Sequence, residues 1–300
     1  MFDQQPLNHS RLWSTNRYVY PVASRRARGI SIGINLNIDK VCNFGCVYCE
    51  VNRGFIPLNR DIDLAAMMTE LQSMLQLAAN GELARDERFT DLNDALGAPL
   101  PVRDIAFSGD GEPTTFRNFD QAVDAAIALR DDSGMQQIKI VIITNATMFQ
   151  RPRVFAALQK VYASDGEVWA KLDAGTEEYY HTVDATTIPF ARILTNLHHL
   201  SQAFPIVIQT CFMRLHGMPP QQQEVAAYAD RLRSLLDNGG AIARVQLYTV
   251  SRPPAEHHVT SLDDNELQVI QQQVATALPE LPIEIFGGAW AGYTDSSASE

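Results

Sequence analysis

The chain has 300 residues, enough for one large α/β domain or two small ones. Its 46% hydrophobic and 20% charged residues are typical of a soluble globular protein, and no apolar stretch is long enough to span a bilayer, so no membrane partner is expected. The net charge of −11 disfavours general binding to nucleic acid, because neutralisation of phosphates supplies most non-specific affinity.

Residues 1–28 are predicted to form an N-terminal arm that is rich in arginine and aromatic side chains. The basic residues are Arg11, Arg17, Arg25, Arg26 and Arg28, and Trp13, Tyr18 and Tyr20 lie among them. Such an arm could receive an anionic or nucleotide-like substrate. The alternative is a solvated segment that lies over the domain. This alternative is favoured, because a run of charged residues is only weak evidence for a binding site. Because the chain begins without a charged and then apolar leader, we expect a cytoplasmic protein.

Three of the four cysteines follow the first predicted strand within eight residues: Cys42, Cys46 and Cys49. A structural [4Fe–4S] cluster takes four cysteine ligands, so a set of three would leave one iron open to a substrate or cofactor. The alternatives are a zinc knuckle or simply buried cysteines. Zinc sites usually take four ligands in two separated pairs, and four cysteines in so long a chain do not indicate a disulfide framework.

Between residues 29 and 255, short β-rich runs alternate with helical patterns, which is the order of a parallel sheet with crossover helices. The predicted strands cover residues 29–37, 104–107, 138–143, 168–172, 206–212 and 244–250. The predicted helices cover residues 63–79, 119–129, 153–162, 190–204 and 221–236. This order predicts a partial (β/α)6 TIM-like barrel of α/β class, in which reacting groups lie at the C-terminal ends of the strands.

The remaining segments are predicted in less detail. One stripe of the first helix is expected to pack on the core: Leu64, Met68, Leu71, Leu75 and Ala78. Residues 81–101 have mixed charge and no clear period, so they are expected to form an insertion or a lid. A C-terminal extension over residues 256–300 is expected to hold a helix that opens at the capping pattern of residues 261–264, followed by a strand over residues 282–286.

Two groups of polar residues follow the second and third predicted strands. After the second strand come Gly109, Asp110, Gly111 and Glu112. Two glycines beside an acid let the backbone turn sharply and approach a ligand closely, and Glu112 would then point into the barrel mouth. The alternative is a plain turn. The third strand ends in Thr144 and Asn145, which indicate either an asparagine turn or a part of the same site.

The later strands add further candidates. Lys171 and Asp173 alternate with Leu172 and therefore face one side of the sheet. Inward charges there are costly unless they pair with each other or with a ligand, and both explanations stay open. Gln209 and Gln246 on the next two strands are also expected to line the barrel mouth. The fourth cysteine, Cys211, is expected to be a small core residue.

These segments together resemble the radical S-adenosylmethionine (radical SAM) superfamily. The run Cys42-Asn-Phe-Gly-Cys46-Val-Tyr48-Cys49 is similar to its CxxxCxxC signature with an aromatic residue before the last cysteine. Asp110-Gly111-Glu112 is similar to its "GGE" motif, and Thr144-Asn145 to a Thr-Asn-Gly, with Ala146 in place of the glycine. The segments beginning at Ser31, Phe107 and Lys171 resemble the wyosine-synthase-like branch of this superfamily.

The resemblance implies both cofactors and the roles of the candidate residues. In the family, three cysteines hold a [4Fe–4S] cluster whose open iron binds the methionine moiety of SAM, and an electron from the cluster releases a 5′-deoxyadenosyl radical. It implies Cys42, Cys46 and Cys49 as cluster ligands and residues 109–112 as the site of the SAM ammonium group. Lys171 and Asp173 would orient the methionine and ribose, and Tyr48 would meet the adenine. It also implies a one-electron donor such as flavodoxin or ferredoxin, and an unidentified substrate.

Three alternatives stay open. The protein could be an activase for a glycyl-radical enzyme, with a partner protein as its substrate. It could modify tRNA or a nucleotide, as wyosine synthases do, although the chain lacks their extra cysteines ahead of the SAM motif and its acidic charge disfavours RNA. From a different class, it could bind a cluster or zinc without catalysis.

Overall fold

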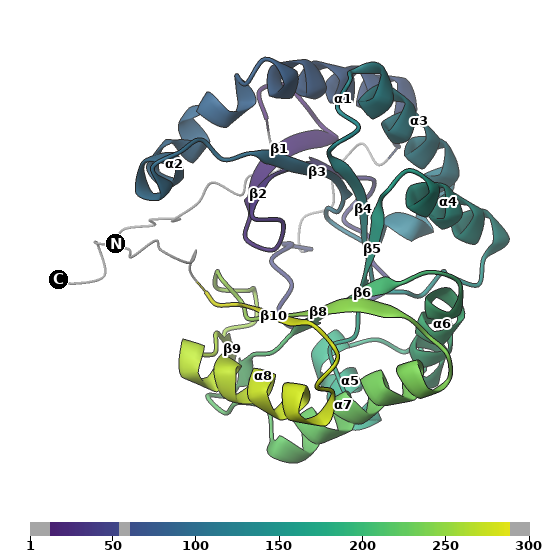
Figure 1. The fold of residues 1–300 in the computed structure, drawn as a ribbon, viewed down its shortest axis with the longest axis vertical. Coiled ribbons are helices and arrows are strands. Elements are labelled where there is room, and N and C mark those ends of the chain that lie inside the picture. The colour runs from purple at the N-terminus through teal and green to yellow at the C-terminus, as the bar shows by residue number, and fades with distance from the viewer. Residues whose placement is uncertain (1–12, 54–60, 289–300) are drawn as a thin grey trace.

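The computed structural model describes residues 13–53 and 61–288. At its centre is an eight-stranded sheet in the order β1-β2-β3-β4-β5-β6-β8-β10, which curls into a half-barrel with helices on its outer face (Figure 1). β1 pairs antiparallel with β2, and the other neighbours in this sheet pair parallel. In the part of the chain that the structure describes, no helix is long and apolar enough to cross a membrane.

The half-barrel consists of the following strands: β1 Val19–Ser24, β2 Gly29–Ile34, β3 Val102–Phe107, β4 Lys139–Thr144, β5 Glu167–Lys171, β6 Ile206–Cys211, β8 Ile242–Tyr248 and β10 Ile283–Phe286. A small second sheet pairs β7 Arg214–Leu215 with β9 Val259–Thr260. All six strands predicted for the barrel are present close to their predicted bounds, and so is the strand predicted in the C-terminal extension. The predicted α/β class and partial barrel are therefore confirmed.

The helices are α1 Leu64–Ala79, α2 Thr90–Leu96, α3 Phe119–Asp132, α4 Pro152–Ala163, α5 Glu177–Asp184, α6 Phe190–Ala203, α7 Gln222–Asp237 and α8 Asp264–Ala277. Short 3-10 helices are η1 Leu83–Arg85, η2 Glu87–Phe89 and η3 Pro113–Thr115. All the predicted helices are present, whereas α2 and α5 were not predicted. The division into arm, barrel and extension stays a prediction, and residues 1–12 and 289–300 of these segments lie outside the described residues.

The second half of the predicted arm is part of the sheet. Val19–Ser24 forms strand β1, whose neighbour Tyr18 is buried against α1. The carboxylate of Glu70 on α1 accepts hydrogen bonds from the backbone N–H groups of Tyr18 and Val19 at 2.8 and 3.0 Å. This strand was not predicted, because Pro21 interrupts its β pattern. An edge strand tolerates proline, since one side of its backbone has no partner in the sheet.

Three local predictions are corrected by the structure. In α1 the buried face is Met67, Leu71, Met74 and Leu75, while Met68 is 39% exposed, so the helix is rotated relative to the predicted stripe. Residues 81–101 form η1, η2 and α2 and bury Leu83, Phe89 and Leu92, so they are a packed segment and not a lid, while the alternative of an insertion stays a prediction. The capping box of α8 is formed by Asp263 and Glu266 rather than by residues 261–264.

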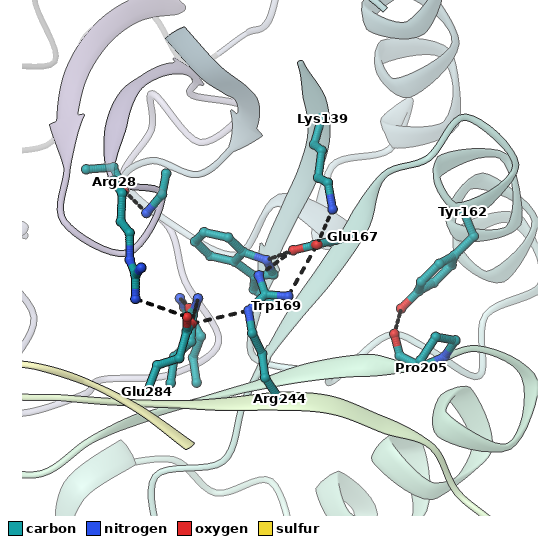
Figure 2. A network of polar contacts seen from close by, with 12 residues as sticks. Arg28, Lys139, Tyr162, Glu167, Trp169, Pro205, Arg244 and Glu284 are labelled. Carbon is teal, nitrogen blue, oxygen red and sulfur yellow. Dashed lines mark hydrogen bonds and ion pairs between the residues drawn. The ribbon is translucent and has the colours of Figure 1, made fainter. Parts of the chain in front are cut away.

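A polar network closes the barrel interior near the N-terminal ends of the strands. Figure 2 shows Lys139, Trp169 and Arg244 converging on the carboxylate of Glu167, with donor–acceptor distances of 2.6, 2.7 and 2.6 Å. Arg244 also pairs with Glu284 on β10 at 3.3 Å. Burial raises the pKa of Glu167, but these hydrogen bonds outweigh it and hold the pKa at about 2. These paired side chains therefore occupy the barrel interior near the N-terminal ends of the strands.

Candidate active site

A cavity of about 350 Å³ lies at the C-terminal ends of the strands, where barrels of this kind carry their reacting groups. It is lined by most of the residues predicted from the sequence: Cys42, Cys46, Tyr48, Cys49, Gly109, Gly111, Glu112, Thr144, Asn145, Lys171 and Gln209. Three predicted residues are not part of the lining, namely Asp110, Asp173 and Gln246. The structure therefore brings the separate motifs to one cavity. The side chains of the three other residues lie outside its lining.

The cysteine loop, residues 41–50, is held by two elements that are distant in sequence. Asn43 accepts a hydrogen bond from the Asn145 side chain after β4, at 2.7 Å, and donates one to Thr147 at 2.8 Å. On its other side, the backbone N–H groups of Gly45 and Val47 donate to carbonyls at the end of α5, at 3.0 and 2.9 Å. The loop is thus held by the segment after β4 and by the end of α5.

The three sulfurs of the loop are half-buried and free. Cys46 Sγ donates to Asp184 at 3.4 Å, and Arg53 Nη2 lies 3.5 Å from Cys49 Sγ. Burial raises the pKa of the Cys42 thiol and raises that of Cys46 well above its usual range, with the charge of Asp184 adding to the second shift. Metal binding requires thiolates and therefore releases these protons.

The donor set fits an iron–sulfur cluster. Among residues 13–53 and 61–288, no three His, Cys, Asp or Glu side chains lie close enough together to hold one metal ion. A [4Fe–4S] cluster differs from a single ion, because each cysteine binds a different iron and the sulfurs need not converge on one point. Cys42, Cys46 and Cys49 supply three thiols that line one cavity and would hold three irons of such a cluster, leaving its fourth iron without a protein ligand from this loop.

The turn after β3 is pressed against the end of β2 and the cysteine loop. Asn35 donates to Asp110 Oδ2 at 2.8 Å and accepts from the Asp110 N–H at 3.1 Å. A Cβ at Gly111 would overlap the carbonyl oxygen of Val41, so only glycine permits this approach. Asp110 therefore holds the turn in place instead of lining the cavity.

The carboxylate of Glu112 is engaged within the protein. It accepts hydrogen bonds from Thr144 Oγ1 at 2.6 Å, from the Asn145 N–H at 2.7 Å, and from both the N–H and the hydroxyl of Thr114. Burial raises the pKa of Glu112, and these donors oppose that shift. Glu112 thus ties the β3 turn to the end of β4. Its side chain was expected to point into the barrel mouth, and Glu112 does line the cavity, with its carboxylate bound to these donors of the protein.

Lys171 and Asp173 pair with each other at 3.1 Å, and two tyrosines extend the pair. Asp173 also accepts hydrogen bonds from Tyr48 Oη at 2.6 Å and from the backbone N–H of Cys211 at 2.7 Å. Lys171 Nζ donates to Tyr248 Oη at 2.8 Å and lies 4.8 Å from the centre of the Tyr48 ring. Burial opposes the charge on Lys171, but Asp173 outweighs it and raises the pKa of the amine well above its usual range. A protonated amine therefore faces the cavity.

The two predicted glutamines form one chain of hydrogen bonds beside this pair. Gln209 donates to Gln246 at 2.8 Å and accepts from Arg26 at 3.3 Å. Both glutamine side chains are buried, and of the two only Gln209 lines the cavity. The arginine is one of several cavity residues that sequence reasoning did not place here: Arg25, Arg26, Arg53 and Arg252. The arginine run of the arm was the only signal for the first two.

The family model described as "Radical SAM superfamily" matches residues 36–232. The chain belongs to the radical SAM superfamily. The superfamily predicted from the motifs is therefore confirmed, and the matched segment contains the cysteine loop, the β3 turn and the Lys171–Asp173 pair.

Curated relatives of this radical SAM protein include UPF0026 proteins. A UPF0026 protein of Helicobacter pylori strain J99 is 25% identical over 252 residues, which cover 82% of this chain and 70% of the relative. UPF0026 protein MJ1312 of Methanocaldococcus jannaschii is 27% identical over 246 residues, which cover 80% of this chain and 65% of the relative.

A solved structure of TYW1 with a lysine–pyruvate adduct bound is similar in fold. It superposes with a TM-score of 0.54 at 13% sequence identity, over 83% of this chain and 74% of that one. At this identity the likeness concerns the fold alone. It agrees at that level with the predicted wyosine-synthase-like branch.

Proposed function

We propose that this radical SAM protein cleaves SAM reductively and uses the resulting 5′-deoxyadenosyl radical to abstract hydrogen from a substrate in the same cavity. The observation that carries the proposal is that the three free thiols of the cysteine loop and the glycine turn after β3 line one cavity. Cys42, Cys46 and Cys49 would hold a [4Fe–4S] cluster, which when bound supplies the electron that breaks the carbon–sulfur bond of SAM.

The chain's own residues would bind and orient SAM. The backbone of residues 109–111 is the proposed partner of the SAM ammonium group, since the Glu112 carboxylate is already occupied by four donors. Lys171 would face an oxygen of the methionine carboxylate or the ribose, with its charge maintained by Asp173. The hydrogen bond from Tyr48 to Asp173 would hold the tyrosine ring in one orientation beside the adenine.

The proposed radical chemistry also requires an electron donor, a reducing compartment and a cavity that excludes solvent. The electron requires a one-electron donor such as flavodoxin or ferredoxin. A cytoplasmic location is proposed because reducing compartments keep thiols unpaired. Enclosure of the cavity matters because solvent would quench or divert a radical.

A lysine adduct is not carried over from the TYW1 structure. Lys171 is the only one of the four lysines that lines the cavity within the described part of the chain. A lysine must lose its proton before it can attack a carbonyl, and Asp173 raises the pKa of Lys171 well above its usual range. We therefore propose a charge-pairing role for Lys171 and no covalent one.

The test is anaerobic reconstitution of the full chain with iron and sulfide, followed by SAM and dithionite. We expect 5′-deoxyadenosine by mass spectrometry, and we expect its loss together with the loss of iron in C42A, C46A and C49A. The matched control is C211A, which removes the cysteine outside the loop and should keep the full iron content. Four irons and bound SAM without 5′-deoxyadenosine would contradict the function, and zinc without sulfide would favour the non-catalytic alternative.

A further inference from the structure

Three arginines form one wall of the cavity: Arg25, Arg26 and Arg252. Arg25 and Arg26 belong to the turn of the β1–β2 hairpin, residues 25–28, and Arg252 follows β8. The hairpin turn reaches across the interior of the half-barrel to the opposite strands. The guanidinium carbon of Arg26 lies 4.6 Å from the centre of the Tyr248 ring on β8, and Arg26 Nη1 lies 3.3 Å from Gln209 Oε1 on β6.

The positive charge of this wall is only partly balanced. Arg252 pairs with Glu50, and within residues 13–53 and 61–288 the structure shows no ion pair for Arg25 or Arg26. In the same part of the chain, Arg25 Nη1 and Arg252 Nε are buried without a hydrogen-bond partner. Burial, and then the neighbouring charge of Arg26, lower the pKa of Arg25 to about 10. Buried donors without an acceptor in the protein are rare, so these two N–H groups are available to a ligand that carries an acceptor.

Resting on the function proposed above, we propose that the wall of Arg25, Arg26 and Arg252 is the subsite that receives a carboxylate or phosphate group of the substrate. Guanidinium groups bind both oxyanions through paired N–H donors, and two unused buried donors are already present. The substrate is accordingly a small anionic molecule whose charged end contacts the hairpin turn and whose remainder extends toward the cysteine loop.

The wall is placed for a substrate and not for the carboxylate of SAM. It is formed by the hairpin turn and the segment after β8, whereas the glycine turn proposed for SAM follows β3. Strands β4, β5 and β6 separate β3 from β8, which Arg252 follows. The hairpin turn leads into β2 next to β3, but Arg26 contacts Tyr248 on β8 and Gln209 on β6, on the far side of the half-barrel. A cation that contacts that turn directly is Arg53, which also lines the cavity and whose Nη1 donates to the carbonyl oxygen of Asp110 at 2.9 Å. SAM and the anion should therefore bind together without competing.

The experiment is calorimetric titration of the reconstituted full chain with inorganic phosphate and, separately, with malonate, each with and without saturating SAM. We expect saturable binding of one anion at one site, unaffected by SAM, and the two titrations distinguish a phosphate from a carboxylate. R25Q and R252Q should each weaken it at least about tenfold, the effect of losing a hydrogen bond to a charged group. R153Q, which breaks the exposed pair with Asp120, is the matched control and should bind like the unaltered protein.

Several outcomes would overturn the subsite: no saturable binding of either anion, displacement by SAM, or equal weakening in R153Q. A second measurement on the unaltered chain covers the case in which the variants do not fold. Phosphate or malonate should protect Arg25 and Arg26 from phenylglyoxal, as read by peptide mass spectrometry, and absence of protection counts against the proposal. The 5′-deoxyadenosine assay is separate. Anion binding without that product would contradict the radical function alone, and product without anion binding would contradict the subsite alone.

Discussion

The carboxylate of Glu112 on the β3 turn accepts a hydrogen bond from the backbone N–H of Asn145 at the end of β4, over 2.7 Å. Asn145 in turn donates from its side chain to Asn43 in the cysteine loop. One buried carboxylate therefore links the turn proposed for SAM, the end of β4 and the loop proposed for the cluster.

Replacing Glu112 by glutamine should destabilise the protein. An amide nitrogen would face either the Asn145 N–H or the Thr144 hydroxyl, so one buried donor loses its acceptor. We expect the free energy of unfolding in urea to fall by about 1–3 kcal/mol. The matched control is E280Q at an exposed position, which should be neutral. An E112Q protein as stable as the control would mean that this carboxylate does not hold the two turns together.

Replacing Lys171 by methionine should be far more costly than the same change at a surface lysine. The change leaves Asp173, whose side chain is fully buried, without its cation. Breaking a buried pair in this way costs about 3–5 kcal/mol. Lys160 pairs with Asp124 at the surface, so K160M should lose no more than about 1 kcal/mol. Equal losses of unfolding free energy for K171M and K160M in chemical denaturation would show that the Lys171–Asp173 pair contributes no more than a surface ion pair.

Motifs that depend on neighbouring residues were predictable from the sequence. The cysteine spacing and the glycines around Asp110 are local patterns, and the alternation of strands and helices carries them to one end of a barrel. The inward direction of Lys171 also followed from strand periodicity.

Contacts between distant segments were not predictable in this way. Nothing in the sequence shows that Asp184, at the end of the unpredicted helix α5, contacts Cys46, or that the hairpin turn carries Arg26 to Gln209. The sequence left open whether Asp173 pairs with Lys171 or with a ligand, and it gave no sign that Tyr48 and the Cys211 N–H donate to its oxygens. Which partner satisfies a buried charge depends on packing across the barrel, and a single sequence does not encode that in any local pattern.

The buried carboxyl of Asp104 on β3 should make stability depend on pH. It is 3% exposed, and its Oδ1 has no hydrogen-bond partner among residues 13–53 and 61–288. Burial is the main reason that its pKa rises from 3.8 to about 7; Glu167 adds to the shift, while Ser31 and Arg26 oppose it. Because the folded state holds this proton more tightly than the unfolded state, its stabilisation is full below about pH 4 and is lost as the pH rises to about 7.

The variant D104N cannot ionise and should be insensitive to this range. Its free energy of unfolding relative to the unaltered protein should therefore increase between about pH 4 and pH 8, by up to about 4 kcal/mol. Urea unfolding at the two pH values measures this difference. Parallel pH profiles for the two proteins would show that Asp104 ionises normally in the folded state.

Replacing Tyr48 by phenylalanine should separate a role in SAM binding from a role in stability. The change removes the hydrogen bond to Asp173 and keeps the ring, so Asp173 retains Lys171 and the Cys211 N–H. We expect a loss of about 1 kcal/mol in the free energy of unfolding, typical of one hydrogen bond, together with weaker SAM binding because the ring is no longer held in one orientation. Equilibrium dialysis with labelled SAM measures the second effect.

The matched control for this change is Tyr162 on α4, whose hydroxyl donates to the Pro205 carbonyl at 3.2 Å, away from the cavity (Figure 2). Y162F also removes one tyrosine hydrogen bond, so its stability should fall by a similar amount while its SAM affinity stays unchanged. If Y48F and Y162F bind SAM equally well, the contact between Tyr48 and Asp173 is structural only. Tyr48 would then have no part in holding the adenine, although the cysteine loop would keep its proposed function.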